Sequence, residues 1–221
     1  LFLLRLSKYN GTHEVIEKER IYSEISEHCN ASGGFAIKKD GTPRLETTWY
    51  ALSIINELEM LSRLNYENII SWINSCQDKK KGCFKSPLYG SYRISETFCA
   101  IKSMELIGGK VHNPALCELW LYERWKQDPT IENTFYFISC LDSLKTLNKK
   151  YASSIIDKCL QPNESKYRLW RYDKNVEIIY RYLYIARYIY GEESEKYKQL
   201  TSNSNEEFKR LSVNTTSKQT K

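Results

Sequence analysis

The sequence predicts an all-α protein built from repeated helical hairpins. A phrase of an acidic residue, a threonine, an aromatic residue and an apolar run occurs three times, around Thr48, Thr97 and Thr134. A glutamine follows each threonine after 29, 30 and 27 residues. A repeat of about 30 to 50 residues is typical of stacked copies of one supersecondary element. Apolar residues also recur at helical spacing, and no segment shows a convincing strand-like alternation.

A second phrase precedes two of the threonines. Gly33-Gly34-Phe35 lies 13 residues before Thr48, and Gly82-Cys83-Phe84 lies 13 residues before Thr97. Glycine permits positive φ and a close approach of the backbone. We therefore expect a tight loop before the first helix of each of these copies, with the phenylalanine packed beneath it.

Individual helices follow from periodicity and from start and stop residues. Residues 45–61 carry a wide apolar face after Pro43, with Thr42 as the expected cap. Gly108-Gly109 ends a helix, and Pro114 starts the next. The expected helices are 14–29, 45–61, 66–77, 95–107, 114–126, 132–147, 151–160, 175–190 and 193–210.

These helices form pairs of unequal character. The first helix of each pair is apolar nearly all round, and the second is more amphipathic. This contrast predicts two concentric layers, the first helices inside and the second helices outside. A closed or partly closed α/α barrel satisfies it, and an open right-handed solenoid is the alternative. We divide the chain into an N-terminal helical segment (1–30), a repeat domain (31–200) and a flexible C-terminal tail (201–221).

Composition narrows the function classes. The 221 residues carry a formal net charge of +6, and the only run of three basic residues is Lys79–Lys81, so no nucleic-acid surface is expected. The seven cysteines form no CxxC pair, and their odd number argues against a disulfide framework. We expect a cytoplasmic protein in a reducing compartment. No apolar run reaches 18 residues, so no transmembrane segment is expected.

The order of these phrases resembles the repeat of the protein prenyltransferase β subunit and squalene/terpene cyclase superfamily. Ile69–Gln77, Gly82-Cys83-Phe84 and Thr97–Leu106 follow its outer helix, glycine loop and inner helix. Gly33–Leu52 resembles a second copy, and weaker copies begin at Thr134 and near Val176. The resemblance implies an α/α toroid whose central cavity holds isoprenoid chains. The chain has fewer repeats than that fold, which is expected of an incomplete toroid.

The catalytic residues of that superfamily are not found at the matching positions. Its prenyltransferases bind zinc through Asp-x-Cys before an inner helix and a later histidine, and its cyclases use Asp-x-Asp-Asp as a proton donor. Neither motif is present, and neither is the Asp-Asp-x-x-Asp of magnesium-dependent synthases. No cofactor is therefore assigned, although zinc or magnesium is left open. The positions that match Asp-x-Cys hold Arg44 and Glu46, Arg93 and Ser95, and Thr130 and Glu132.

Aromatic and charged residues near the inner-helix starts are the candidate binding residues. Aromatic side chains suit isoprenoid tails and carbocations, and arginine suits a diphosphate. Ordinary core packing and arginine–glutamate pairing between repeats are the alternatives. The predicted cavity and rim residues are Arg44, Glu46, Trp49, Tyr50, Arg93, Glu96, Phe98, Phe135, Tyr136 and Tyr180.

Three functions remain open from the sequence. The first is an enzyme of the prenyltransferase or terpene cyclase type that binds an isoprenoid, its diphosphate or another apolar small molecule. The second is a non-catalytic toroid that serves as a binding or interaction module. The third is one subunit or fragment of a larger enzyme, with a second protein subunit as partner.

Overall fold

The computed structural model describes residues 18–87, 92–146, 176–195, 197–199 and 201–202. Over these residues the fold is all-α, as predicted, and the only extended pairings are two isolated bridges. The predicted helix at 151–160 and Gln161 lie outside the described residues, as do the ends of several other predicted helices. The helices are α2 (Lys18–Ser26), α3 (Leu45–Glu57), η1 (Leu61–Arg63), α4 (Tyr66–Ser75), α5 (Ile94–Leu106), α6 (Pro114–Gln127), α7 (Ile131–Ser143) and α10 (Val176–Tyr190).

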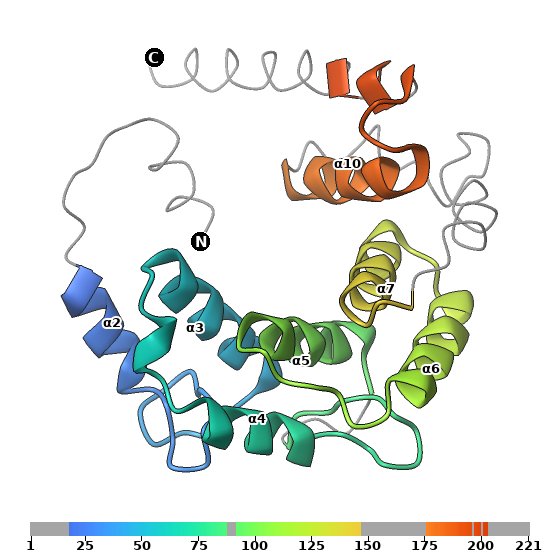
Figure 1. The fold of residues 1–221 in the computed structure, drawn as a ribbon. Helices are drawn as coiled ribbons and strands as arrows, with labels where there is room; N and C mark the ends of the chain where they lie inside the picture. The colour runs from blue at the N-terminus through green and yellow to red at the C-terminus, as the bar shows by residue number, and fades with distance from the viewer. Residues whose placement is uncertain (1–17, 88–91, 147–175, 196, 200, 203–221) are drawn as a thin grey trace, which may run out of the picture. The chain divides into compact units, whose positions relative to one another are not determined.

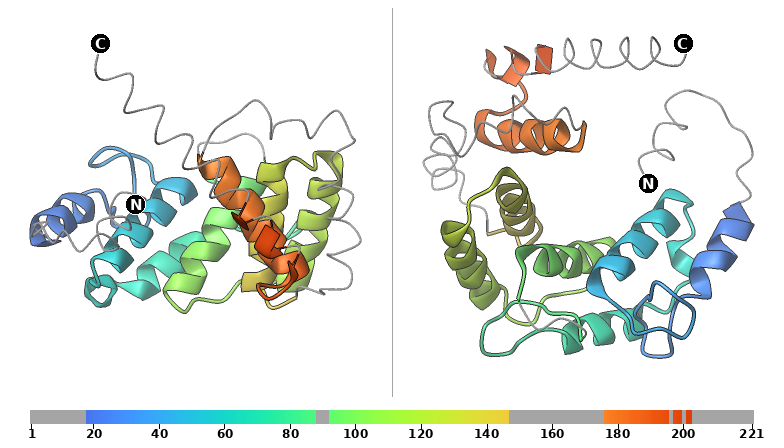
Figure 2. Two further views of the ribbon diagram at one scale, coloured as in Figure 1. Left: turned by 90° about the horizontal axis from the view of Figure 1, so that it is seen from above. Right: turned by 180° about the vertical axis from the view of Figure 1, so that it is seen from behind.

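The chain divides into two compact units, with the boundary between Arg124 and Trp125 in α6. In the first unit α3 packs along α5, and α4 lies against α5 (Figure 1). Both views of Figure 2 show α3 and α5 as neighbours. In the second unit α7 packs on α10. The apolar first helices of the predicted hairpins therefore form the main helix contacts within each unit.

The repeated threonine binds the glycine loop to its own helix. Thr48 Oγ1 accepts a hydrogen bond from the Phe35 backbone N–H at 2.9 Å, and Thr97 Oγ1 accepts one from Phe84 at 3.1 Å. Both threonines and both phenylalanines are completely buried. The spacing of 13 residues thus corresponds to one buried hydrogen bond in each copy.

The third copy keeps the threonine but replaces the donor. Thr134 follows a short connection without a Gly-x-Phe phrase, because α6 ends at Gln127 and α7 begins at Ile131. Its Oγ1 accepts a hydrogen bond from the indole Nε1 of Trp125 at 2.9 Å. The Trp125 ring also stacks on Phe137 at a centroid distance of 5.2 Å. A side chain therefore supplies the hydrogen bond that a loop amide supplies in the first two copies.

The repeated glutamine closes the loop in only one described copy. Gln77 follows the end of α4, and its Nε2 donates to the Gly82 carbonyl at 2.8 Å, which bridges the helix end and the loop. In the preceding copy the Cys29 thiol takes this place and donates to the Gly33 carbonyl at 3.8 Å. Gln127 is exposed at the end of α6, in the copy that lacks the loop.

Each glycine loop also contacts the start of a later helix. A Cβ atom on Gly33 would lie 2.5 Å from the Asn68 carbonyl carbon in α4, and one on Gly82 would lie 2.5 Å from the Cys117 nitrogen in α6. Real Cβ atoms do not approach backbone this closely. Only glycine lets the loop of one copy pack against the helix that follows.

The N-terminus of α3 is completed by the next copy. We expected Thr42 as its cap, and this is wrong: the N-cap is Arg44, whose side chain makes no capping bond. Instead, Ser86 Oγ accepts a hydrogen bond from the Leu45 N–H at 2.9 Å, across 41 residues. A helix end needs an acceptor for its orphan N–H groups, and a distant serine supplies one here.

The C-termini of α3, α5 and α7 share one geometry. In each, the second residue beyond the C-cap donates to a carbonyl five positions earlier, as in Met60 to Ile55 at 3.0 Å and Gly109 to Met104 at 2.8 Å. This is a Schellman motif, which requires a left-handed residue at the preceding position. Glu59, Gly108 and Lys145 occupy that position, with φ of 65°, 71° and 58°. The expected helix end at Gly108 is confirmed.

Gly82 and Gly108 both have positive φ, but we expect their substitution by alanine to lower the free energy of unfolding by different amounts. Gly108→Ala meets nothing within 4 Å, so it loses only the conformational preference, about 1 kcal/mol of unfolding free energy. Gly82→Ala adds a backbone clash, so we expect a loss of about 2–4 kcal/mol. Chemical denaturation followed by circular dichroism measures both. Equal losses for the two variants would contradict the close contact between Gly82 and α6.

Substitutions at the adjacent residues Thr48 and Thr47 test the hydrogen bond between Thr48 and the Phe35 N–H. Thr48→Val leaves the buried Phe35 N–H without its acceptor, which costs about 1–3 kcal/mol of unfolding free energy. Thr47→Val makes the same chemical change on the half-buried neighbouring position and should stay within about 0.5 kcal/mol. If Thr48→Val left the unfolding free energy unchanged in the same denaturation experiment, this bond would not hold the loop.

Candidate functional site

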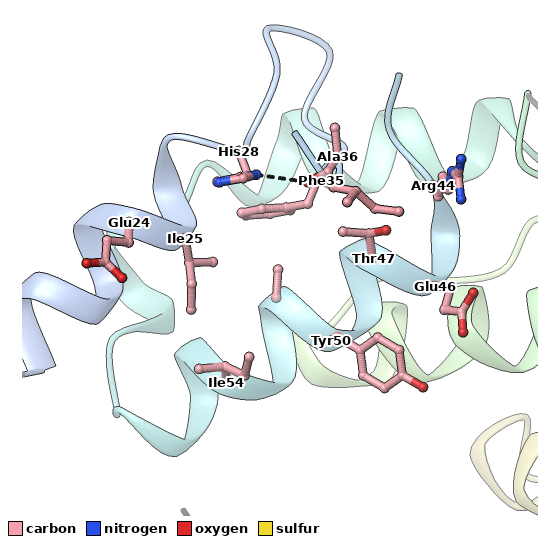
Figure 3. A pocket seen from close by; sticks show the side chains of 12 residues that line it. Glu24, Ile25, His28, Phe35, Ala36, Arg44, Glu46, Thr47, Tyr50 and Ile54 are labelled. Atoms are coloured by element: carbon pink, nitrogen blue, oxygen red, sulfur yellow. Dashed lines mark hydrogen bonds between the residues drawn. The ribbon is translucent and has the colours of Figure 1, made fainter. Parts of the chain in front are cut away.

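An open pocket of about 600 Å³ lies beside α3 in the first unit (Figure 3). Side chains from α2, from the glycine loop and from α3 surround it (Figure 3). Its wall is mainly apolar, with Phe35 completely buried behind it. The lining residues are Glu24, Ile25, His28, Phe35, Ala36, Ile37, Arg44, Glu46, Thr47, Tyr50, Ala51 and Ile54.

Three predicted rim and cavity residues meet at this pocket. Arg44 and Glu46 lie at the N-terminal end of α3, and Tyr50 follows one turn later with 51% of its surface exposed (Figure 3). His28 Nδ1 lies 3.2 Å from the Ala36 carbonyl oxygen, which holds its ring at the edge of the loop. The pocket thus combines an apolar wall with charged groups at its ends.

Two further predicted residues form a pair between α3 and α5. Trp49 and Phe98 contact edge to face with a centroid distance of 6.0 Å. Each follows directly after the buried threonine of its copy, so they are equivalent positions of the repeat. Phe98 is buried and Trp49 is half-buried. The geometry is the one that aromatic rings prefer.

The second unit gathers the remaining predicted aromatic residues. Phe135 lies 5.7 Å from Tyr136 and 6.3 Å from Tyr180, measured between ring centroids. Arg181 joins this group, with its guanidinium carbon 5.3 Å from the Tyr136 ring centre. Sequence reasoning missed Arg181, although an arginine in the middle of an apolar helix was a usable signal.

Arg181 is held by a carboxylate and a phenol. Its Nη1 lies 3.0 Å from Glu132 Oε1, and the Tyr136 hydroxyl donates to the same oxygen at 2.9 Å. The Arg181 side chain is only 14% exposed, whereas that of Glu132 is 55% exposed. The ion pair therefore offsets the cost of placing a guanidinium among aromatic rings.

Glu96 has a different environment from that expected for a rim residue. It is 4% exposed, and its Oε2 accepts a hydrogen bond from the Ser86 N–H at 2.6 Å. Because Ser86 in turn caps α3 at Leu45, Glu96 supports the junction between two copies. Arg93 is the N-cap of α5, as Arg44 is of α3. Of the four predicted rim residues, Glu96 thus lies in the core.

The donors needed for a zinc site are not brought together. In the part of the chain that the structure describes, no group of three or more His, Cys, Asp or Glu side chains could hold a metal ion. Burial raises the pKa of Cys76 and Cys83 to about 11 and that of Cys117 to about 12, so these thiols are protonated at neutral pH. Structural and catalytic zinc sites need three or four protein ligands, and none of these three cysteines belongs to such a group among the described residues. None of the described helices is long and apolar enough to span a membrane.

Comparison with known proteins agrees with the repeat. The family model described as "Prenyltransferase alpha-alpha toroid domain" matches residues 2–113, which is half of the chain. The chain is also similar to protein farnesyltransferase subunit beta of Schizosaccharomyces pombe, with 27% identity over 122 residues. This alignment covers 54% of the chain and 31% of that relative, so the chain spans about a third of the relative's length.

The different environments of two glutamates give a direct test. Glu96→Ala removes a buried acceptor of a charge-assisted hydrogen bond, so we expect a loss of about 2–3 kcal/mol of unfolding free energy. Glu46→Ala in the exposed first turn of α3 should cost under about 0.5 kcal/mol. Chemical denaturation curves of both variants measure this difference in unfolding free energy. Similar small losses would mean that Glu96 does not support the junction.

Proposed function

Because the chain belongs to the prenyltransferase alpha-alpha toroid domain family, we propose that it binds an isoprenoid or its diphosphate on the aromatic surface of its inner helices. The observation that carries this proposal is the recurrence of an aromatic residue directly after the buried threonine. Trp49, Phe98 and Phe135 occupy this position in the three copies. The threonine hydrogen bonds fix the rotation of each helix, and thereby the direction of the aromatic ring that follows.

The aromatic residues supply the contact with the isoprenoid chain. Trp49 and Phe98 form an edge-to-face pair on adjacent helices of the first unit, in which the buried Phe98 supports the half-buried Trp49, and the accessible part of the Trp49 ring is the surface proposed to contact an alkene chain. Ring faces also stabilise positive charge, which develops when an allylic diphosphate ionises. Phe135 and its tyrosine neighbours provide a second surface of the same kind within the second unit.

The arginines at the helix starts supply the contact with the diphosphate. Arg44 and Arg93 are the N-cap residues of α3 and α5, where the helix dipole adds partial positive charge. Guanidinium groups bind phosphate oxygens through paired hydrogen bonds. A metal ion is not assigned to this site, because the described residues do not provide its ligands.

A second subunit is part of the proposal. The similar yeast protein is named as a beta subunit, and a beta subunit implies a partner in its own enzyme. We infer that this chain also works beside an alpha-type subunit. Transfer of the isoprenoid would then require that subunit together with the parts of a beta subunit that this chain does not cover. Binding of the isoprenoid can be measured on this chain directly, whereas transfer requires the assembled enzyme.

The binding proposal predicts a specific adduct with farnesyl or geranylgeranyl diphosphate in native mass spectrometry. Arg44→Ala combined with Arg93→Ala should weaken this adduct about 10-fold or more, because two charge-assisted contacts are lost. Binding of farnesol should not change, since it lacks the diphosphate. Absence of binding for both diphosphates at micromolar concentrations would exclude the proposal.

Two control variants separate the contribution of the arginine contacts from those of net charge and of the aromatic surface. Lys79→Ala combined with Lys80→Ala removes the same charge from an exposed loop and should leave the adduct unchanged. Trp49→Leu should weaken the diphosphate and farnesol alike, because it removes the aromatic surface that both share. If the double lysine and double arginine substitutions weakened the adduct equally, the arginines would contribute to binding only through the net charge of the chain.

A further inference from the structure

The turn that follows α4 concentrates the positive charge of the chain (Figure 1). Lys79, Lys80, Lys81 and Lys85 lie close together in the sequence, directly after Asp78. These five residues carry a formal charge of +3, which is half of the net charge of the whole chain. The run of three lysines is exposed, and Lys85 is half-buried. We call residues 78–85 the lysine turn.

The first copy closes its glycine loop without these charges. The N–H of the loop glycine donates to the carbonyl of Asn30 at 3.0 Å in the first copy, and to that of Asp78 at 2.7 Å in the second. Between these closing residues the first copy holds only Ala31 and Ser32, whereas the second holds Lys79–Lys81. A neutral pair of residues therefore suffices for the same hydrogen bond. Loop closure does not explain the three lysines.

The lysine turn is rigidly built, yet its ammonium groups are not neutralised by ion pairs. Asp78 Oδ1 accepts hydrogen bonds from the Lys80 and Lys81 N–H groups at 2.8 and 3.0 Å, and its Oδ2 accepts one from the Tyr92 hydroxyl at 2.5 Å. The ammonium groups of Lys81 and Lys85 lie 4.2 and 5.2 Å from the Tyr92 ring centre. Within the described part of the chain, none of the four lysines forms an ion pair. Such a group of like charges repels itself and attracts an anionic partner.

We propose that the lysine turn docks the chain on the anionic surface of a lipid bilayer. The residue type favours this partner, because lysine is a compact, hydrated point charge, whereas arginine suits fitted, bidentate recognition. Lysine is also depleted in protein–protein interfaces. A nucleic-acid surface typically presents a longer basic stripe than a single turn. Each lysine close to an anionic bilayer strengthens binding about fivefold, so several in one turn act together.

The proposed contact is peripheral and electrostatic. None of the described helices could span a membrane, and no exposed large apolar side chain of the described residues lies on the lysine turn. The attraction therefore acts over about one Debye length, roughly 10 Å at 0.1 M salt, and should be reversible. It involves neither Trp49 nor the arginines Arg44 and Arg93. Failure of the isoprenoid proposal would thus leave this inference intact, and the reverse also holds.

Co-sedimentation of the full chain with lipid vesicles tests the proposal. We expect binding to phosphatidylcholine vesicles that contain about 30% phosphatidylserine, and little binding to pure phosphatidylcholine. Raising the salt concentration from about 0.05 to 0.5 M should release the chain. Lys79→Ala combined with Lys80→Ala should weaken binding to the anionic vesicles about 10-fold or more. The same double variant should leave the isoprenoid adduct unchanged, which separates the two proposals.

A matched variant removes two charges elsewhere in the same unit. Lys18 and Lys110 are exposed, and Lys110 follows the C-terminal end of α5. The helix separates it by about 20 Å from the N-terminal end, next to which the lysine turn lies. Lys18→Ala combined with Lys110→Ala should change vesicle binding by less than about twofold. Both double variants should keep Tm within about 2 °C of the parent, because exposed positions are changed.

Three results would overturn the proposal. The parent chain would fail to bind the anionic vesicles, would bind pure phosphatidylcholine equally well, or would lose binding equally through the two double substitutions. The same mixtures are also tested with a glutamate-rich peptide and with single-stranded RNA. If either bound in a way that depends on Lys79 and Lys80 while vesicle binding did not, the lysine turn would be assigned to that partner instead of a bilayer.

Discussion

The buried hydrogen bond to the repeated threonine is the constraint on which the rest of the structure depends. It joins the glycine loop to its own inner helix in two copies, and the glycine joins the same loop to a later outer helix. Both contacts are needed, because a loop amide without an acceptor is costly to bury. In the third copy the Trp125 indole replaces the amide at Thr134, so the hydrogen bond persists where the loop does not.

Sequence reasoning succeeded where a contact has a fixed spacing. The helices and the loops followed from local periodicity and from the glycine residues. The distance of 13 residues was visible in the sequence, but the hydrogen bond that accounts for it was found only in the structure. It failed where different residue types perform one role. Cys29 holds at the first loop the place that Gln77 holds at the second, and Ser86, not the expected Thr42, caps α3 across 41 residues. Neither Cys29 nor Ser86 belongs to a residue pattern that recurs at a fixed spacing in the sequence.

The candidate site was predicted in part for the same reason. The aromatic residues lie where the repeat places them, but Glu46 and Glu96 were treated as equivalent and are not. Glu46 lies two residues before its threonine and Glu96 one residue before, and one residue rotates a side chain by about 100° around a helix. One carboxylate therefore faces the pocket and the other lies in the core. Arg181 was missed because no spacing relates it to Glu132.

The same rotation explains how one inner helix can serve both packing and binding. Each copy in a repeat protein buries its faces only against neighbouring copies, so the stacking surface must be conserved in shape along the array. On α3, Tyr50, Ala51 and Ile54 line the pocket, whereas Trp49 projects about 100° away from Tyr50 and contacts Phe98 of α5. The position after the threonine therefore serves packing and binding together. Phe98 is buried in the contact between the two copies, whereas Trp49 is half-buried and keeps part of its ring accessible, so a substitution at this position changes both the packing and the surface offered to a ligand.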